Sequence, residues 1–398
     1  MVWLGRGSTT EEALDKYDID QARYSPDLSR FIRQWLKRGH GEIYLLHPGH
    51  IALSGESSIR RGSTGRVNTK LLQPAMNSCR CIKDDHEVGL IKKANEISAL
   101  AHEEVLRSLR SFSNEGQVEA RFLDVSIAHG AKHQSYGLIA GSGENAAILH
   151  YQANDQDFKD RQLLCLDAGA EWNCYSSDVT RTFPLSGQWP SKEAKEIYDL
   201  VDEMQRSAMK VIGPGKLFIN AHIMAHKIAV DGLLRLGVLH NGTSKEILEA
   251  GTSLAFYPHG LGHHMGLEVH DVSPNGRSAS LYQQSLETYG DLSNDCWSDH
   301  LQNSTICRAP CQTGYSSLEP GMVITVEPGV YFNRYALERI YLPDPVHSKY
   351  INKKVLERYI PVGGVRIEDD ILITKSGWEN LTTAAKGDAA LKIIRGEK

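Results

Sequence analysis

Apolar side chains recur at helical spacing in three segments of the chain. The first segment begins at Asp84 and carries acids early and arginines late, a charge order that suits a helix dipole. A second segment follows Pro190, and a third runs from about Asn220 to Gly237, a residue suited to the end of a helix. We therefore expect three amphipathic helices, with apolar stripes at Val88, Ile91, Ile97, Ala101, Val105 and Leu109 in the first and at Ala194, Ile197, Val201, Met204, Ala208 and Val211 in the second.

Four further apolar runs have the character of β-strands. They are QLLCLDAGAEW (162–172), CYSSDVTRTFPL (174–185), GMVITVEPGVYF (321–332) and GVRIEDDILIT (364–374). The chain shows no internal repeat of short period. Helices segregated from antiparallel strands predict an α+β architecture.

Composition narrows the class of protein. A chain of 398 residues with 41% hydrophobic and 23% charged residues is typical of a globular protein. Its net charge of −5 gives no electrostatic reason to expect nucleic acid or an anionic membrane as a partner, and no apolar run is long enough to span a bilayer. Seven scattered cysteines and the lack of a secretory signal predict reduced thiols in a cytoplasmic protein.

The composition and the apolar periodicity of the chain change at two points. Residues 1–82 form a segment too short for a well-buried domain of its own, and residues 83–398 contain the periodic helices and strands. Within the second part, residues 273–317 are rich in Ser, Gln, Asn and Asp and show no sustained period. We expect a partial N-terminal domain, a catalytic domain and, inside the latter, a long insertion loop.

Two aspartates stand on consecutive strand-like runs. If the turn between the runs centres on Trp172 and Asn173, Asp167 lies opposite Asp178, with Cβ atoms roughly 5 Å apart. Carboxylates that close repel each other unless a cation lies between them, and the spacing suits a pair of divalent ions about 3.5–4 Å apart. Two exposed acids on a solvated hairpin, or a bulge at Gly169, remain open as alternatives.

Two glutamates lie among apolar strand residues. Glu327 stands directly before a Pro-Gly turn, and Glu368 shares a strand face with Arg366 and Asp370. A buried acid needs a partner, so each glutamate is either a metal ligand or half of a structural ion pair.

Histidines supply candidate nitrogen ligands. HGLGHHMGLEVHD (259–271) holds His259, His263, His264 and His270, but its glycines disfavour a helix, and Gly260 stands where a zincin motif needs Glu. A further candidate, His150, ends GSGENAAILHY (141–151), which we interpret as a turn that feeds a short strand.

Taken in order, ILHY, DAGAEWNCYSSDVTRTF, HGLGHHMGLEVHD, TVEPGVY and GVRIEDD resemble the motifs of the pita-bread metallopeptidases, the group of aminopeptidase P and fungal-type prolidase. The resemblance covers residues 84–385. It implies a pita-bread fold of curved antiparallel sheets covered by helices, and hydrolysis of the N-terminal Xaa-Pro bond of small peptides. It also implies two manganese ions, replaceable by cobalt, and a dinuclear site whose ligands are Asp167, Asp178, His263, Glu327 and Glu368.

The resemblance also assigns roles to individual residues. Asp178 and Glu368 would bridge the metals, and Glu327 would shuttle the proton. His150, His259 and His270 would hold the substrate and stabilise the oxyanion, His259 and His270 with catalytic roles, and Arg366 would orient carboxylates or bind substrate. His264 has no counterpart role and is interpreted as a surface or packing residue.

The chain also departs from the family pattern. The short N-terminal segment looks truncated, which would weaken the homodimer typical of the family. The insertion 273–317 offers only Arg308 as a clamp for a substrate carboxylate. Aminopeptidase and prolidase (strict dipeptidase) therefore stay open as activities, and a catalytically impaired binding protein of the same fold is the alternative from another class.

Overall fold

The computed structural model describes residues 3, 5–37, 42–50, 67–272 and 317–397. The predicted insertion, with Arg308, lies outside the described residues apart from Ser317. By its contacts the chain divides into two units, Met1–Met76 and Asn77–Lys398. No helix among the described residues is long and apolar enough to cross a membrane.

The first unit is small and consists of short elements. Helix α1 carries a capping box in which Thr9 and Glu12 each bond the other's backbone N–H. The elements are α1 (Thr10–Lys16), α2 (Leu28–Lys37), the parallel pair β1 (Ile43–Tyr44) and β2 (Val67–Asn68), and the start of α5 (Leu72–Cys81).

The second unit carries the three predicted helices. Asp84 caps α6, and Ser191 caps α8, while Gly237, with φ +74°, follows the end of α9 in the left-handed conformation that favours glycine. All three predictions are confirmed. The helices of this unit are α6 (Asp85–Ser108), α7 (Glu115–Ala128), α8 (Lys192–Met209), α9 (Phe218–Arg235), α10 (Ser244–Glu249), α13 (Arg334–Ala336), α14 (Pro345–Ser348), α15 (Lys353–Tyr359) and α16 (Asp388–Arg395).

Each predicted strand run is in fact two strands separated by a break. The strands are β3 (His133–Gln134), β4 (Ile139–Ser142), β5 (Leu163–Asp167), β6 (Ala170–Trp172), β7 (Tyr175–Ser176), β8 (Thr180–Pro184), β9 (Val323–Val326), β10 (Gly329–Tyr331), β11 (Gly364–Arg366), β12 (Asp369–Thr374) and β13 (Gly377–Asn380). They pair as β4-β5-β8, β3-β6-β7, β13-β12-β9 and β10-β11, always antiparallel. The α+β prediction is therefore confirmed.

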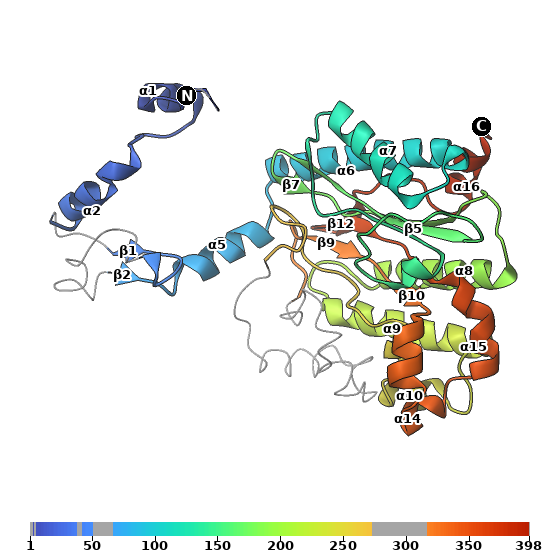
Figure 1. The fold of residues 1–398 in the computed structure, drawn as a ribbon. Helices are drawn as coiled ribbons and strands as arrows, with labels where there is room; N and C mark the ends of the chain where they lie inside the picture. The colour runs from blue at the N-terminus through green and yellow to red at the C-terminus, as the bar shows by residue number, and fades with distance from the viewer. Residues whose placement is uncertain (1–2, 4, 38–41, 51–66, 273–316, 398) are drawn as a thin grey trace. The chain divides into compact units, whose positions relative to one another are not determined.

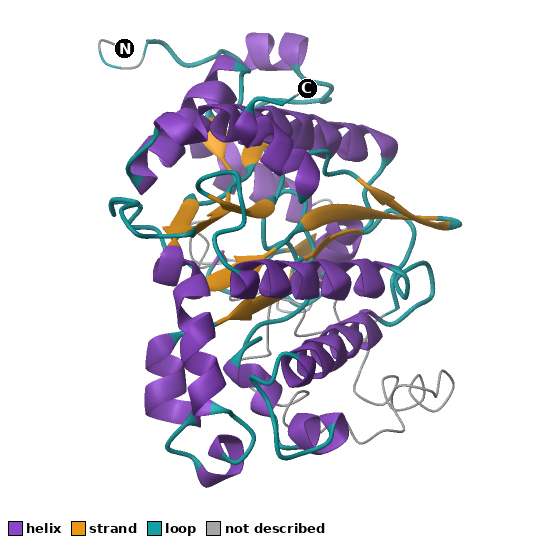
Figure 2. Ribbon diagram, turned by 90° about the vertical axis from the view of Figure 1, so that its right-hand side faces the viewer, coloured by secondary structure: helices purple, strands orange, loops and turns teal. Residues whose placement is uncertain are grey.

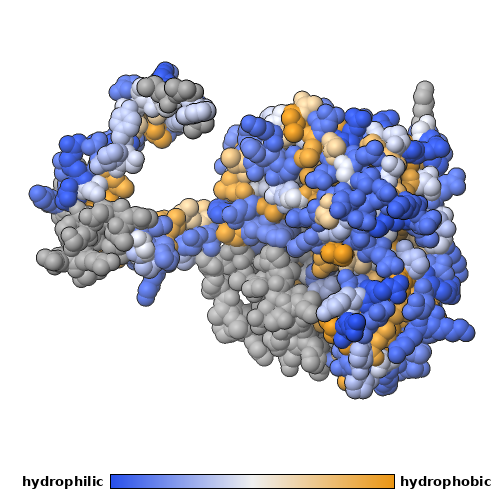
Figure 3. Space-filling model, viewed as in Figure 1, coloured by the Kyte–Doolittle hydropathy of each residue, from blue (hydrophilic) through white to orange (hydrophobic). Residues whose placement is uncertain are grey.

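The short strands lie between two layers of helices. In Figure 1, α6, α7 and α16 lie on one side of the strands, and α8 and α9 lie on the other. Figure 2, turned by 90°, again shows strands between helices. The outer surface in Figure 3 is largely hydrophilic, with apolar side chains scattered over it. The strands are therefore shielded on both faces, which explains why their sequences are apolar in continuous runs.

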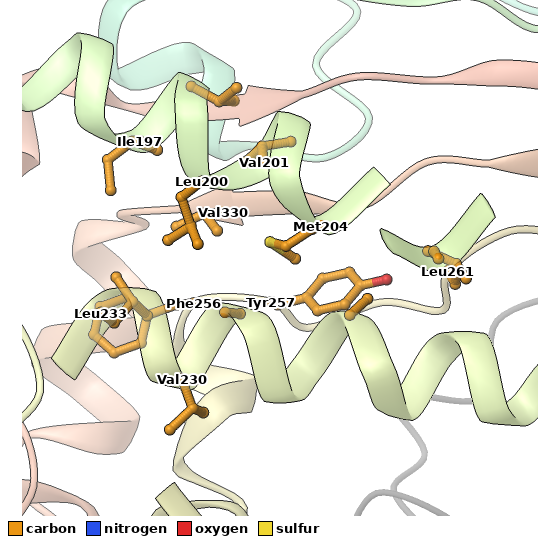
Figure 4. Close-up of a cluster of buried hydrophobic side chains, with 14 of the residues drawn as sticks. Ile197, Leu200, Val201, Met204, Val230, Leu233, Phe256, Tyr257, Leu261 and Val330 are labelled. Carbon is orange, nitrogen blue, oxygen red and sulfur yellow. The ribbon is translucent and has the colours of Figure 1, made fainter. Parts of the chain in front are cut away.

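Each helix layer has its own core. The larger one packs the apolar stripes of α8 and α9 against β9–β12, and Figure 4 shows Met204 of α8 beside the ring of Tyr257. The other joins α6, α7 and α16 to β4, β5 and β8. The two cores hold the ends of the strands from both sides, and the candidate site lies at those ends.

The interpretation of residues 146–149 as a strand is wrong. After β4, residues Gly143–Ala147 form a 3-10 helix, and His150 follows in a turn. Polar side chains explain the difference, because Ser142 and Asn145 both donate to the buried carboxylate of Glu115 and curl the chain around it.

Candidate metal centre

The four candidate carboxylates lie at the four breaks between strands. Asp167 ends β5, Asp178 stands between β7 and β8, Glu327 between β9 and β10, and Glu368 between β11 and β12. Pro328 explains one break, because proline has no N–H to continue a ladder. A break turns a side chain away from strict alternation, so the breaks can aim four acids at one point.

The predicted register of the hairpin that carries Asp167 is wrong by two residues. The turn centres on Asn173 and Cys174, both with positive φ, so that Asp167 pairs with Thr180 rather than with Asp178. Asn-Cys is not a recognisable hairpin turn, and for that reason the sequence suggested the wrong centre. The register differs by two residues, and because side chains alternate with a period of two, Asp167 and Asp178 still share a face.

Gly169 lets the chain pass from one sheet to the next at this point. A Cβ there would lie 1.9 Å from the carbonyl oxygen of Ser177. Only glycine allows the two strands to come this close.

The histidine segment lies along β9 as an extra extended edge. Thr325 N donates to His263 O at 2.9 Å, and Glu327 N donates to Leu261 O at 2.7 Å. Gly262 makes this contact possible, because a Cβ at this position would lie 2.0 Å from Thr325 O. The pairing places His263 beside Glu327, and the segment is not a helix, as the glycines predicted.

Asp178, His263 and Glu368 converge closely enough to hold one ion. One ligand atom from each lies within 4.8 Å of the others. His263 Nε2 lies 3.4 Å from Asp178 Oδ2 and 3.3 Å from Glu327 Oε1. The fifth candidate, Asp167, reaches the same place through Tyr136, whose hydroxyl lies 2.5 Å from Asp167 Oδ1 and 2.6 Å from Asp178 Oδ1.

The ring orientation of His263 suits a metal ligand. Its Nδ1 lies 3.0 Å from His264 O and must donate to that carbonyl, which leaves Nε2 directed at the acids. A backbone carbonyl that fixes the far nitrogen is the usual companion of a metal-binding histidine. His264 is buried, and this carbonyl is its contribution to the site.

Burial makes the carboxylates hard to ionise together. Burial, and then the charges of Asp178 and Glu327, raise the pKa of Glu368 well above its ordinary value. Burial also raises the pKa of Asp167, against the effect of Arg366, and raises that of Glu327 to about 7. The single proton of the Tyr136 hydroxyl cannot satisfy two carboxylates at once. Crowded, buried acids of this kind fit divalent cations, which would remove the repulsion.

The donor atoms indicate which kind of cation fits. Four carboxylates and one imidazole form a mostly hard, oxygen-rich set, which suits Mn²⁺ better than Cu or an all-thiolate zinc site. The set also matches a pair of ions better than one, because Asp167 lies outside the group of three that can meet at a single point.

Arg366 and His259 are connected by a directed chain of hydrogen bonds. Arg366 donates to Asp167 Oδ2 at 2.6 Å and to the Tyr331 hydroxyl at 3.0 Å. His259 Nδ1 lies 2.7 Å from Gly260 O and therefore donates, so that its Nε2 accepts from Tyr331 at 2.8 Å. Burial and the charge of Arg366 lower the pKa of His259 to about 3, which keeps the ring neutral.

The other two histidines stand at the mouth of the site. Both His150 and His270 are exposed, and their ring centroids are 6.5 Å apart. His270 lies edge-on to His263, at 4.4 Å between centroids. They flank an opening rather than fill a core.

A cavity of about 380 Å³ unites these side chains. The nine residues assigned to metal or substrate within the described part of the chain line it together with Tyr136, and apolar walls come from Ile139, Leu149 and Val269. The lining includes Asp167, Asp178, His263, Glu327, Glu368, His150, His259, His270 and Arg366. A concave site with apolar walls and converging acids and imidazoles is suited to a small organic substrate.

Sequence reasoning missed Tyr136 and Tyr331. Tyr331 follows Glu327 by four residues on the next strand, and alternation could have placed it near the site. Tyr136 lies between β3 and β4 in QSYGL, where no spacing or charge marks it.

Comparison with known proteins decides the family. Residues 89–375 match the model of metallopeptidase family M24. The chain belongs to this family. It is 54% identical to a probable Xaa-Pro aminopeptidase of Pyrenophora tritici-repentis, over all of this chain and 60% of that protein. It is 49% identical to a probable Xaa-Pro aminopeptidase of Aspergillus clavatus, over 99% of this chain and 77% of that one.

Solved structures of two aminopeptidases P share the fold. Zinc-substituted aminopeptidase P of Escherichia coli in complex with product is 30% identical, with a TM-score of 0.77, over all of this chain and 80% of that one. Proline aminopeptidase P II of Yersinia pestis is 28% identical, with a TM-score of 0.76, over all of this chain and 81% of that one. The predicted pita-bread fold is confirmed.

The match to longer relatives is partial. The chain spans 60%, 42% and 46% of the length of the curated relatives from Pyrenophora tritici-repentis, Pyrenophora teres and Phaeosphaeria nodorum. The activity and partners of the complete relatives therefore do not transfer directly to this chain.

Proposed function

We propose that this chain is a dinuclear metal-dependent exopeptidase that cleaves the N-terminal Xaa-Pro bond of small peptides. One observation carries the proposal: the buried group Asp178, His263 and Glu368, with Asp167 and Glu327 beside it, faces the same cavity as three histidines. The names of the M24 relatives, probable Xaa-Pro aminopeptidases, support the substrate class.

The proposed ligands divide between two ions. Asp178 and Glu368 would serve both ions, Asp167 would hold one of them, and His263 with Glu327 would hold the other. Manganese, with cobalt as a substitute, is the proposed metal because the donors are mainly carboxylate oxygens. When bound, such ions act as Lewis acids that activate water and polarise a carbonyl at neutral pH.

The chain's own groups perform the remaining steps. Glu327, beside His263 at this group of acids, accepts a proton from the attacking water and passes it on. The exposed rings of His150 and His270 hold the peptide and stabilise the developing oxyanion, while the neutral ring of His259, whose two nitrogens are already bonded, contacts the peptide through its face or edge. Arg366 holds the carboxylate of Asp167 in place through their ion pair of 2.6 Å.

A substrate length series tests the proposal. The purified chain, loaded with manganese, is given an Xaa-Pro dipeptide and an Xaa-Pro-Yaa tripeptide, with an Xaa-Ala-Yaa tripeptide as the control. Release of the first residue from the proline tripeptide is expected. Turnover of the dipeptide alone would replace aminopeptidase with prolidase, and turnover of none would leave a binding protein of the same fold.

Metal content tests the ligands. About two manganese ions per chain are expected, and Asp178→Asn is expected to lose metal and activity together. Activity that survived this substitution would refute the ligand assignment. We also propose a cytoplasmic location, which is supported by the free thiols of Cys79, Cys81, Cys165 and Cys174. We further propose a homodimer, which sedimentation tests.

A further inference from the structure

Gln205 joins two strand breaks from behind the candidate metal centre. This residue lies on α8 and is completely buried. Its side-chain amide nitrogen donates to Val326 O at 3.0 Å and to Ile367 O at 3.2 Å. These carbonyls belong to the residues immediately before Glu327 and Glu368, so one side chain is bonded beside two of the proposed metal ligands.

The breaks explain why a side chain is needed there. β9 ends at Val326, and Ile367 belongs to no strand, since β11 ends at Arg366 and β12 begins at Asp369. A buried carbonyl that loses its ladder partner costs free energy unless another donor reaches it. The two hydrogens of one amide group serve both carbonyls and thereby tie the two breaks to each other.

The orientation of this amide is fixed by a neighbouring ion-pair network. Gln205 Oε1 accepts from Lys386 Nζ at 2.7 Å, so the nitrogen must face the two carbonyls. Lys386 also contacts Asp369 Oδ2 at 2.5 Å, and Asp369 Oδ1 accepts from Arg181 at 2.7 Å. Arg181 in turn donates to Glu368 O at 2.6 Å. The peptide that carries Glu368 is therefore held from the side away from the cavity.

We infer that Gln205 is a positioning residue that sets the separation of Glu327 and Glu368 and thereby the affinity of the site for its metal ions. This inference rests on the proposed function, because it assumes that both glutamates are ligands. The plainer alternative is that Gln205 only satisfies two carbonyls in the core and affects stability alone. Groups that orient metal ligands typically change metal affinity by 10–100-fold when removed.

Gln205→Met separates these possibilities, because methionine has a similar volume and neither donates nor accepts strongly. Val201→Ala is the matched control: Val201 is one turn earlier on α8 and completely buried, but its side chain forms no hydrogen bond. For each purified variant, manganese affinity is measured by titration calorimetry of the metal-free protein, and the Tm of that protein is measured alongside.

Gln205→Met is expected to weaken manganese binding at least about tenfold. Val201→Ala is expected to lower Tm while it leaves the affinity within about twofold. Unchanged affinity in Gln205→Met would overturn the inference and leave the proposed function intact. Absence of manganese binding by the unmodified chain would overturn the proposed function, and the inference with it.

Lys386→Met provides the test if Gln205→Met fails to fold. Lys386 is partly exposed, with 31% of its side-chain surface accessible, so its loss is tolerated more easily. Without it the amide of Gln205 is free to rotate, and a smaller loss of manganese affinity, about threefold to tenfold, is expected. An affinity equal to that of the unmodified chain would overturn the inference.

Discussion

Nε2 of His263 lies 3.3 Å from Oε1 of Glu327. Burial alone would lower the pKa of His263, but Asp178 and Glu327 raise it to about 9, while burial raises the pKa of Glu327 to about 7. Near neutral pH the metal-free pair therefore retains protons that a cation must displace, since a metal binds neutral imidazole and ionised carboxylate.

Manganese binding is thus expected to release protons and to strengthen as pH rises from 6 to 9. Calorimetric titrations at pH 6, 7 and 8, each in two buffers of different ionisation enthalpy, give both the affinity and the number of protons released. A manganese affinity that does not change with pH would contradict the protonation of His263 and Glu327 in the metal-free protein.

Gly262→Ala is expected to disrupt the pairing of the histidine segment with β9. The added Cβ would lie 2.0 Å from a backbone oxygen that cannot rotate away, so about 1–3 kcal/mol of stability and much of the metal affinity should be lost. Gly89→Ala is the control, because nothing lies within 4 Å of its Cβ position on α6, and it should gain up to about 1 kcal/mol. Urea denaturation measures the free energy of unfolding of both variants. Equal values for the two would show that the close approach at Gly262 is unimportant.

Buried neutral histidines are expected to make the protein acid-sensitive. Burial lowers the pKa of His222 to about 4, and neither ring nitrogen has a hydrogen-bond partner among the described residues. Because the unfolded chain binds the proton more readily, stability is lost as pH falls from about 6.5 towards 4, by roughly 3 kcal/mol for this residue once pH is below 4.

His222→Leu should reduce that loss without harming the fold, because leucine removes two unpartnered ring nitrogens and fills the space beside the rings of His226 and Tyr257. Tm measured from pH 7 to pH 4.5 should fall less steeply in the variant. A parallel decline in both proteins would place the acid sensitivity elsewhere.

Glu115→Gln is expected to impair substrate binding more than turnover. Glu115 Oε2 accepts from Tyr151 and from Gln156 N, and an amide nitrogen in place of that oxygen cannot accept either bond. The bonds organise the loop that carries His150, so KM should rise severalfold while kcat changes little. Glu119→Gln, one turn further along α7, should leave both constants unchanged because its contact with Asn154 is more exposed.

The helices could be predicted from sequence because their signal is local. The stripe from Val88 to Leu109 and the cap at Asp84 are independent of the rest of the fold. Only some of the strand breaks carry a local signal: Pro328 marks one and Gly169 another, whereas no glycine or proline stands at Ile367, where contacts with distant strands end the ladder. The turn at Asn173 and Cys174 was misplaced for the same reason: its sequence favours no single register.

The candidate site shows a similar division. The five proposed ligands were assigned from motifs that resemble a known family, whereas pattern alone left each acid with a structural alternative. Tyr136 and Gln205 lie in none of these motifs, and Tyr331, although it ends TVEPGVY, carried no assigned role; their hydrogen bonds revealed all three. A residue that supports a ligand is chosen by geometry, and a single sequence carries little record of that geometry.

The strand breaks also affect how cooperatively the protein unfolds. Because the four acids stand at the ends of β5 and β8 in one three-stranded sheet and of β9 and β12 in another, cations held by them would join these two sheets as a crosslink does. Amide hydrogens of β8 and β12 should then exchange with solvent at separate rates in the metal-free protein and at one slower, shared rate when manganese is bound. Metal loading would thus convert two separately exchanging sheets into a single cooperative unit.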